Sequence, residues 1–359
     1  MSGCPVSIEK INGAWMLRGH DLVREAALDD VTDSSQVSRF LQVPNGMDGE
    51  EHDAFRALTD RYLTHERVHA LEPMFTRVAE EVVAGAIDRG GVADAVGLGA
   101  RFAVRASSAW LGWPESLEAE LLEWVRANWE ATRSGQFART AAVAAWYNSI
   151  IAALLNTRRN APTDDVTSEL MNDMFLGRSL TEEEITSILR NWTGGDLGSM
   201  ALCIGVVLAY LADHPDLQEH LRSGETSTRE WHLVLDEILR LDDPFVANRR
   251  VATRDATLGG EQILTGDRLY LNWTAANLDE SVFSRFDPEG NAENNLVYGI
   301  GRHVCPGREL ATEQLRIFTQ AVLARTTTIE PDEHPRTRSL PPSGGYIEVP
   351  VRLLPIRDG

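Results

Sequence analysis

The segment from Tyr298 to Gly307, YGIGRHVCPG, constrains this chain more strongly than any other. A single cysteine, Cys305, stands there among three glycines and close to Arg302 and His303. Because glycine has no Cβ, a backbone of this kind can approach a large flat ligand closely. A thiol with a free pKa of about 8.5 needs a metal, nearby cations or backbone N–H donors to persist as a thiolate. The segment therefore predicts a cofactor-ligating cysteine. A buried structural cysteine would account for neither the glycines nor the basic residues.

A helix is predicted directly after this segment, because apolar residues recur at helical spacing at positions 310, 311, 315 and 318. The N-terminal end of that helix would point towards the sulfur of Cys305. Its dipole would then stabilise a negative charge on the sulfur.

The same ten residues resemble the heme-binding loop of the cytochrome P450 superfamily. The family pattern is an aromatic residue followed by Gly-x-Gly-x-(His or Arg)-x-Cys-x-Gly, and every fixed position is filled here, with Tyr298 where phenylalanine is usual. The resemblance implies heme b, iron protoporphyrin IX, with Cys305 as the iron ligand and Tyr298, Gly299 and Gly307 in the cofactor-binding loop. A thiolate ligand pushes electron density onto heme iron and favours O–O cleavage, which implies oxygen activation.

Two further segments match the family in the expected order. Glu237 and Arg240 are three residues apart and can pair on one helix face. Arg250 begins a stretch, RVATRD, similar to the family's Arg-x-Ala-x-x-Asp. The resemblance implies a structural role for the Glu237–Arg240 pair and contact with a heme propionate for Arg250.

His52 and Arg56 are four residues apart and project from the same helix face, where two cations favour an anion. The family uses His-x-x-x-Arg at this place to bind a propionate, whereas the pair taken alone is also compatible with solvated surface charges. The resemblance implies that four residues neutralise the two propionates through charge-assisted hydrogen bonds: His52, Arg56, Arg250 and His303.

The stretch from residue 191 to 199, NWTGGDLGS, departs from the family pattern. The distal helix of the family carries (Ala or Gly)-Gly-x-(Asp or Glu)-Thr, in which the acid and the alcohol relay protons. When the glycine is aligned at 194 and the acid at Asp196, Leu197 takes the place of the alcohol. Asp196 is then the expected proton-handling residue, with Ser199 or Thr193 supplying a hydroxyl through water.

Substrate walls are implied only by position in the family pattern. The residues so implied are Trp192, Leu197, Phe245, Val246, Ala247 and Tyr346.

Composition excludes several classes of partner and compartment. With 34 Lys and Arg against 54 Asp and Glu, the formal charge of −20 repels nucleic acid and anionic membrane surfaces. Cys4, Cys203 and Cys305 are widely separated and support neither a disulfide framework nor a CxxC metal site. The first residues, MSGCP, lack the features of a signal peptide or membrane anchor. We therefore expect a cytoplasmic protein without nucleic-acid or membrane partners.

The periodicity of apolar residues predicts a mostly helical chain. Helices are expected at 66–87, 116–132, 147–156 and 181–212, and strands near 13–17, 256–258, 268–272 and 346–354. No repeat or linker divides the sequence, so residues 1–359 are expected to form a single domain. The resemblance implies the cytochrome P450 fold: a large helical part, a small mixed or antiparallel β-sheet region, and heme between the distal and proximal helices.

The resemblance implies a monooxygenase that hydroxylates or similarly oxidises a small organic molecule of secondary metabolism. Dioxygen would be the oxidant, with electrons from NAD(P)H through a separate ferredoxin and ferredoxin reductase. Since Leu197 takes the usual place of the distal threonine, a peroxide-driven oxygenase or an oxidative coupling enzyme is the first alternative. A non-catalytic heme sensor or carrier is the second, and a helical protein without heme is the third.

Overall fold

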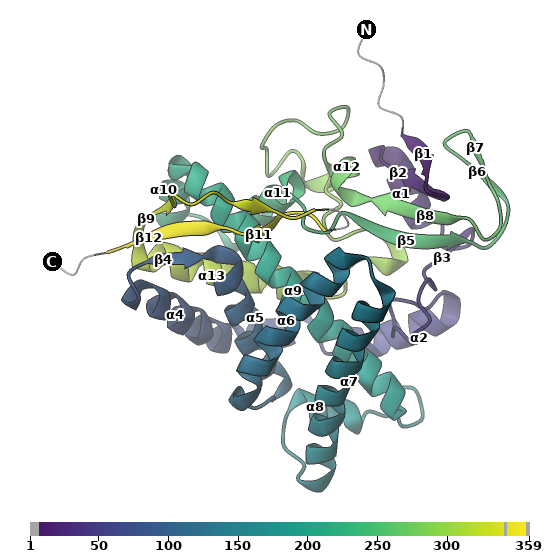
Figure 1. Cartoon of the computed structure of the whole chain (residues 1–359), viewed down its shortest axis with the longest axis horizontal. Coiled ribbons are helices and arrows are strands. Elements are labelled where there is room, and N and C mark those ends of the chain that lie inside the picture. The colour runs from purple at the N-terminus through teal and green to yellow at the C-terminus, as the bar shows by residue number, and fades with distance from the viewer. Residues whose placement is uncertain (1–6, 341–342, 357–359) are drawn as a thin grey trace.

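Helices build most of the structure, a computed structural model that describes residues 7–340 and 343–356 (Figure 1). The helices are α1 (His20–Leu28), α2 (Gly49–Asp60), α3 (His65–Ala70), α4 (Glu72–Asp88), α5 (Ala95–Leu111), α6 (Glu118–Ser134), α7 (Phe137–Asn160), α8 (Val166–Met171), α9 (Glu182–Asp213), α10 (Pro215–Arg222), α11 (Thr228–Leu241), α12 (Trp273–Asn277) and α13 (Arg308–Arg325). The strands are β1 (Ile8–Ile11), β2 (Ala14–Leu17), β3 (Asp33–Ser34), β4 (Val92–Asp94), β5 (Ala247–Ala252), β6 (Ala256–Leu258), β7 (Glu261–Ile263), β8 (Arg268–Asn272), β9 (Thr326–Pro331), β10 (Thr337–Arg338), β11 (Tyr346–Glu348) and β12 (Pro350–Pro355).

The long helix α9 runs through the middle of the helical part (Figure 1). Thr181 caps it: the Thr181 hydroxyl accepts a hydrogen bond from the Glu184 amide at 3.2 Å, and the Glu184 carboxylate accepts one from the Thr181 amide at 2.7 Å. This capping box satisfies N–H groups that the first helical turn leaves free. Helix α5 crosses α9 closely, since a Cβ added at Gly99 would lie 2.9 Å from the Ala201 Cα. The predicted helix at 181–212 is therefore confirmed, and it is a core element.

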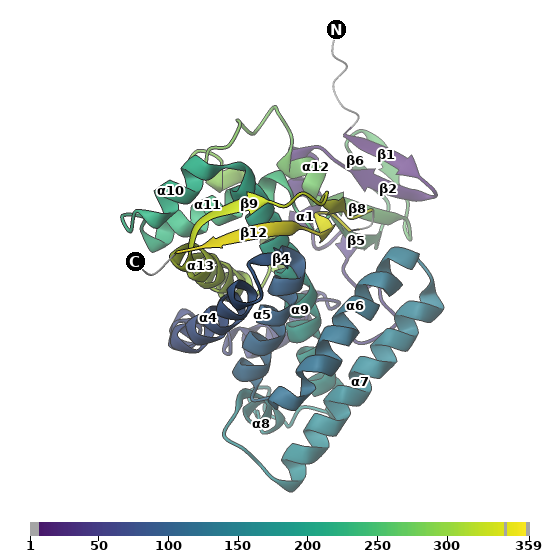
Figure 2. The same cartoon turned by 60° about the vertical axis from the view of Figure 1, so that its left-hand side comes forward.

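The strands form one mixed sheet and three smaller antiparallel ones. The larger sheet has the order β1-β2-β8-β5-β3, in which only β2 and β8 are parallel. A second sheet, β4-β12-β9, joins distant parts of the chain, and its strands lie beside the helical part in both views (Figures 1 and 2). The predicted strands near 13–17, 256–258, 268–272 and 346–354 are all present.

Buried apolar side chains gather in two clusters. The larger one fills the space between α4, α5, α9, α11 and α13, and the smaller one lies between α1 and the five-stranded sheet. Helices α6 and α7 run antiparallel along one side of α9 (Figure 2). The mainly helical fold with a small sheet region agrees with the prediction.

One predicted helix is broken in the structure. The span 66–87 is divided at Leu71 into α3 and α4, and Pro73 stands in the first turn of α4. Proline has no N–H to continue the hydrogen bonding of α3, but it is tolerated in the first turn of a new helix. The proline therefore explains the break.

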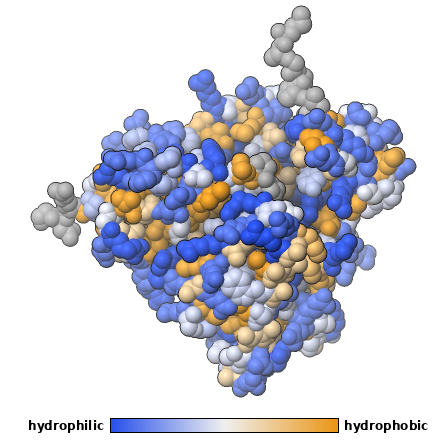
Figure 3. Space-filling view, viewed as in Figure 1, coloured by the Kyte–Doolittle hydropathy of each residue, from blue (hydrophilic) through white to orange (hydrophobic). Residues whose placement is uncertain are grey.

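Two described helices, α7 and α9, are long and apolar enough to cross a membrane by length and composition alone. The apolar window of α9 is 72% buried and that of α7 is 28% buried. Burial accounts for α9 as a core helix. On the face seen in Figure 3, hydrophilic side chains alternate with apolar ones. Cys4 and the rest of the N-terminal segment used above lie outside the described residues.

Candidate functional site

The loop that carries Cys305 is shaped by glycine. Gly299 and Gly301 have φ values of +70° and +78°, a left-handed region that side chains with a Cβ disfavour. The Cys305 amide donates a hydrogen bond to the Tyr298 carbonyl at 2.9 Å, which closes the loop. Gly307 ends it as the residue before α13. The backbone conformation therefore explains why glycine stands at positions 299 and 301, which the sequence alone did not.

Several groups act on the Cys305 thiol. Burial raises its pKa, whereas the backbone N–H of Gly307 and the guanidinium groups of Arg56 and Arg308 lower it. Asp196 of α9 is close enough to raise it as well, which places the glycine-rich part of α9 near the sulfur. Because a thiolate is the form that ligates a metal, the N–H donor and the two cations are suited to a ligand cysteine.

Arg56 differs from the expectation that it faces a propionate. Its Nη1 donates to the carbonyls of Val304 and Arg302 at 2.8 and 3.3 Å, and its Nε donates to Asp60 at 2.7 Å. The guanidinium thus holds the backbone on either side of His303. In this structure Arg56 therefore positions the cysteine loop from α2. Its side chain is long enough to reach the carbonyls of Arg302 and Val304.

The other three expected propionate partners come together from three elements. The rings of His52 on α2 and His303 in the loop lie 4.4 Å apart between centroids. Burial first, and then Arg250 and His52, lower the pKa of His303 to about 4. Arg250 on β5 is buried and lies 3.4 Å from Asp33. Arg250 and His52 thus both weaken protonation of His303.

This cluster is suited to hold an added anion. The pKa of Asp33 is raised by burial to about 7 even beside Arg250, so Asp33 is only a weak counter-ion. A carboxylate between His52, His303 and Arg250 would be neutralised by charge-assisted hydrogen bonds and would restore protonation of the imidazoles. Open space for the rest of a ligand lies beside α9, where a Cβ added at Gly194 or Gly195 would have no heavy atom within 4 Å. The residues therefore fit a flat dianionic cofactor held through Cys305.

We expect Arg250→Ala to reduce heme occupancy, because it removes a buried donor whose charged hydrogen bond is worth about 1.5–3 kcal/mol. That loss corresponds to heme binding weaker by roughly tenfold or more. His52→Ala should act in the same direction. The measurement is the ratio of heme to protein after purification. Arg249→Ala is the matched control, since Arg249 is the exposed neighbour on the same strand. Full occupancy in Arg250→Ala and His52→Ala would contradict the assignment.

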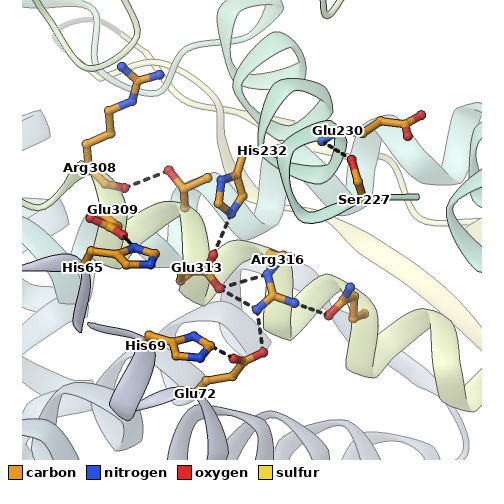
Figure 4. A network of polar contacts seen from close by, with 12 residues as sticks. His65, His69, Glu72, Ser227, Glu230, His232, Arg308, Glu309, Glu313 and Arg316 are labelled. Atoms are coloured by element: carbon orange, nitrogen blue, oxygen red, sulfur yellow. Dashed lines mark hydrogen bonds and ion pairs between the residues drawn. The ribbon is translucent and has the colours of Figure 1, made fainter. Parts of the chain in front are cut away.

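Helix α13 is fastened to its surroundings just after the cysteine loop (Figure 4). Arg316 donates to Glu72 of α4 at 2.7 Å and to Glu313, and Glu313 pairs with His232 of α11 at 2.7 Å. Arg316 and His232 hold the pKa of Glu313 at about 2 although burial opposes them. This network fixes the N-terminal half of α13, and with it the helix end that faces Cys305.

The open face of α9 is defined by Gly195 and Ser199. Gly195 is exposed although it lies in the middle of a core helix, and Ser199 follows one turn later. The Ser199 hydroxyl donates a hydrogen bond to the Gly195 carbonyl. The hydroxyl that borders the open space is therefore that of Ser199.

The structure corrects three expectations about neighbouring residues of α9. Leu197 is 1% exposed in the core cluster, about half a helical turn away from Gly195 and Ser199. Thr193 is equally buried, and its hydroxyl donates to the Leu189 carbonyl at 2.6 Å within the helix. Trp192 packs between Tyr62 and Trp110, with ring centroids 5.2 and 5.3 Å away. Helix geometry turns Leu197 and Thr193 away from the open face. Trp192, three residues before Gly195 and seven before Ser199, shares that side of the helix, but its ring is buried against Tyr62 and Trp110.

Two expected substrate segments do lie together. Phe245 pairs with Ser343 in an isolated β-bridge, and the Gly344 amide donates to the Pro244 carbonyl at 3.0 Å. Phe245 is exposed, and the following Val246 and Ala247 are partly buried. Tyr346 is instead buried and stacks against Arg338, whose Cζ lies 4.1 Å from the ring centroid. Tyr346 is thus a core residue that supports this turn.

A further attachment was not anticipated from the sequence. The segment 41–43 is bound to α9 through its backbone: Ser187 accepts from the Val43 amide and donates to the Leu41 carbonyl, both at 2.9 Å. Arg190 also donates to Leu41, and Asn191 donates to the Val43 carbonyl at 2.7 Å. The sequence signal is a group of polar residues at 187, 190 and 191 that share one face of an otherwise apolar helix. They fix the loop before α2 against α9.

Comparisons with known proteins agree on one family. The sequence profile described as Cytochrome P450 matches residues 231–352. The cyclomarin C epoxidase CymV of Salinispora arenicola is 28% identical over 346 residues, which cover 91% of this chain and 87% of that protein. Cytochrome P450 CYP105Q4 of Mycobacterium marinum is 28% identical over 339 residues, covering 88% and 80%.

Solved structures give the same fold. A mutant of P450 EryK in complex with erythromycin B superposes with a TM-score of 0.88 at 22% identity, over 99% of this chain and 95% of that one. Cytochrome P450 CYP101C1 superposes with a TM-score of 0.82 at 26% identity, over 98% and 90%. The fold and the cysteine loop together define a heme-iron monooxygenase. The chain belongs to the cytochrome P450 superfamily.

Proposed function

We propose that this chain binds heme b through Cys305 and uses dioxygen to hydroxylate or epoxidise a small organic molecule of bacterial secondary metabolism. Electrons would come from NAD(P)H through a separate ferredoxin reductase and ferredoxin, with the reaction taking place in the cytoplasm and residues 1–359 acting as one domain. The observation that carries the proposal is that Asp196 of α9 acts on the pKa of the Cys305 thiol, so the thiol lies near the stretch of α9 whose open face is formed by Gly195 and Ser199.

The heme would supply dioxygen binding and O–O cleavage, which a thiolate ligand favours. The chain supplies the surroundings. Arg56 and Gly307 hold the cysteine loop and favour a charged sulfur. His52, His303 and Arg250 provide donors for the two carboxylates. Ser199 presents a hydroxyl whose proton is already donated to Gly195, so its oxygen is free to accept a hydrogen bond from a water in the open space.

The position of Ser199 bears on the choice between oxidants. With Ser199 as the alcohol, the family pattern falls on residues 195–199, which places Gly198 where the acid is usual. Leu197 then no longer supports peroxide chemistry, because it lies in the core and does not take the place of the alcohol. The absence of a carboxylate at 198 keeps a peroxide-driven oxygenase or an oxidative coupling enzyme as the second candidate.

We expect Ser199→Ala to lower the fraction of NAD(P)H electrons that reach product, by up to about 10²-fold, because the hydroxyl oxygen that positions a proton-carrying water in the open space is lost. The measurement compares product with NAD(P)H consumption in the presence of ferredoxin and its reductase, beside a parallel reaction with hydrogen peroxide alone. Thr193→Val is the matched control, since its hydroxyl is bonded inside the helix.

The peroxide-driven candidate would be favoured if Ser199→Ala leaves the coupling of NAD(P)H consumption to product unchanged and if hydrogen peroxide alone gives as much product as NAD(P)H with the redox partners. A wild-type protein that binds heme but turns over with neither oxidant would indicate a sensor.

A further inference from the structure

The side chain of Asp196 lies where α5, α9 and α13 meet. Its carboxylate accepts a hydrogen bond from the Ser107 hydroxyl of α5. Gln314 of α13 is fully buried and lies on the other side, near enough to lower the pKa of Asp196. The amide nitrogen and oxygen of Gln314 have no hydrogen-bond partner among the described residues. A partly buried carboxylate and an unpartnered, fully buried amide thus lie beside each other at this junction, where unsatisfied polar groups are costly.

The groups around Asp196 are polar but carry no positive charge among the described residues. Tyr147 approaches from α7, Cys203 lies on α9 itself, and Cys305 lies in the cysteine loop, and Asp196 raises the pKa of each. Burial raises the pKa of Asp196 to about 6, although Ser107 and Gln314 lower it. The carboxyl therefore changes its protonation near neutral pH, as a proton donor must.

Asp196 is also adjacent to the open face of α9. It lies three residues before Ser199, and the Ser199 hydroxyl is 3.3 Å from the Asp196 carbonyl oxygen. Residues three apart are neighbours on a helix surface. An acid and an alcohol are therefore present on α9 one turn apart, and Gly198 occupies the position directly before the alcohol.

We propose that Ser107 and Gln314 are positioning residues that hold Asp196 as the proton-relaying acid for Ser199, in place of an acid at position 198. The proposal rests on the monooxygenase function proposed above. In each cycle the protonated carboxyl of Asp196 gives a proton to a water hydrogen-bonded to Ser199, and the carboxylate recovers a proton from solvent water. No bond other than O–H changes, and nothing is oxidised or reduced in this step.

Ser107 has a defined task in this arrangement. Its hydroxyl donates to the carboxylate form of Asp196 and therefore stabilises the charged state, while fixing the carboxyl between two helices. Removing one such hydrogen bond should raise the pKa of Asp196 by about one unit. The Gln314 amide has both a donor and an acceptor to offer, so it can follow either protonation state.

The test uses the heme-loaded protein and infrared difference spectroscopy of the carboxylic-acid C=O band. The band that is present in the wild type and lost in Asp196→Asn belongs to Asp196, and its intensity is followed against pH. We expect the midpoint to rise by about one pH unit in Ser107→Ala. It should return towards the wild-type value in Ser107→Thr, which restores the hydroxyl. Ser108→Ala is the matched control, because the Ser108 hydroxyl makes no hydrogen bond to a described residue and its midpoint should not move.

The coupling of NAD(P)H consumption to product is then measured over the same pH range. The proposal is supported if the pH profile of coupling shifts with the infrared midpoint in Ser107→Ala and not in Ser108→Ala. It is overturned if the midpoint does not move in Ser107→Ala, or if it moves while the coupling profile stays fixed, which would leave Ser107 a purely structural role. Failure of the proposed function is seen separately, as a wild type that has no heme-thiolate spectrum or no turnover.

Discussion

Cys305→Ala is expected to abolish the red-shifted Soret band of the reduced, carbon monoxide-bound protein. That spectral shift reports a thiolate bound to heme iron, and Cys305 is the cysteine placed in the glycine loop that fits the cofactor. Some heme should remain bound through His52, His303 and Arg250, because these side chains act on its carboxylates rather than on the iron. Dioxygen-dependent turnover should fall below detection, since the ligand that favours O–O cleavage is gone.

The matched control for this prediction is Cys203→Ala. Cys203 is the other free cysteine in the described part of the chain, and it is buried in α9. Burial raises the pKa of its thiol well above the usual value, which disfavours the thiolate. Cys203→Ala should therefore keep the spectrum. Retention of the band in Cys305→Ala, or its loss in Cys203→Ala alone, would show that the ligand is assigned to the wrong residue.

The cysteine loop was predictable because its information is local. Positive φ angles at 299 and 301 demand glycine whatever surrounds them, so the pattern of glycines around Cys305 is visible in the sequence. The start of α9 is local in the same sense, because Thr181 and Glu184 cap the helix by reaching only three residues along the chain.

The open face of α9 was not predictable for a physical reason. Residues 194–198 contain three glycines, so a short pattern can be matched in two registers. The two matches differ by two residues, which is a rotation of about 200° around a helix. That rotation exchanges Leu197 for Ser199 at the open face. Only packing against α5, α6 and α13 decides which side of the helix stays open, as the 3.1 Å approach of Trp129 Nε1 to a Cβ added at Gly198 illustrates.

The remaining wrong predictions concern side chains whose length or bulk decides where they lie. The spacing of His52 and Arg56 correctly placed both on one helix face, yet the longer guanidinium extends to the carbonyls around His303. Trp192 and Tyr346 were assigned to substrate walls by position alone. Both are large side chains that gain more by packing in the core, and both are more than 90% buried.

Arg240→Ala is expected to cause the largest loss of stability of any single replacement considered for this chain. Arg240 and Glu237 are each 1% exposed and form two hydrogen bonds of 2.7 and 2.8 Å. Arg240 also donates to the Asn277 carbonyl at 2.5 Å. Glu237 accepts hydrogen bonds from the backbone N–H of Asp287 at 3.0 Å and from the side-chain amide of Asn291 at 2.8 Å. The pair thus joins α11 to the end of α12 and to the segment that leads into the cysteine loop.

Breaking a buried pair leaves one charge without its partner, which costs about 3–5 kcal/mol. We expect Arg240→Ala and Glu237→Gln to lower the urea midpoint of unfolding strongly and to reduce heme occupancy, because the loop loses its support. Arg229→Ala, which breaks the exposed pair with Glu289, is the control and should leave the midpoint nearly unchanged.

The double variant Glu237→Gln/Arg240→Met separates a stranded charge from a lost contact. If the cost of each single variant comes mainly from an uncompensated buried charge, removing both charges should be less damaging than the sum of the two single losses. If the double variant instead loses as much stability as the sum of the two single variants, or more, the hydrogen bonds to Asn277, Asp287 and Asn291 carry the stability. In that case the pair acts chiefly as a junction between α11 and the segments before the cysteine loop, and the two charges matter less than the positions of their donors and acceptors.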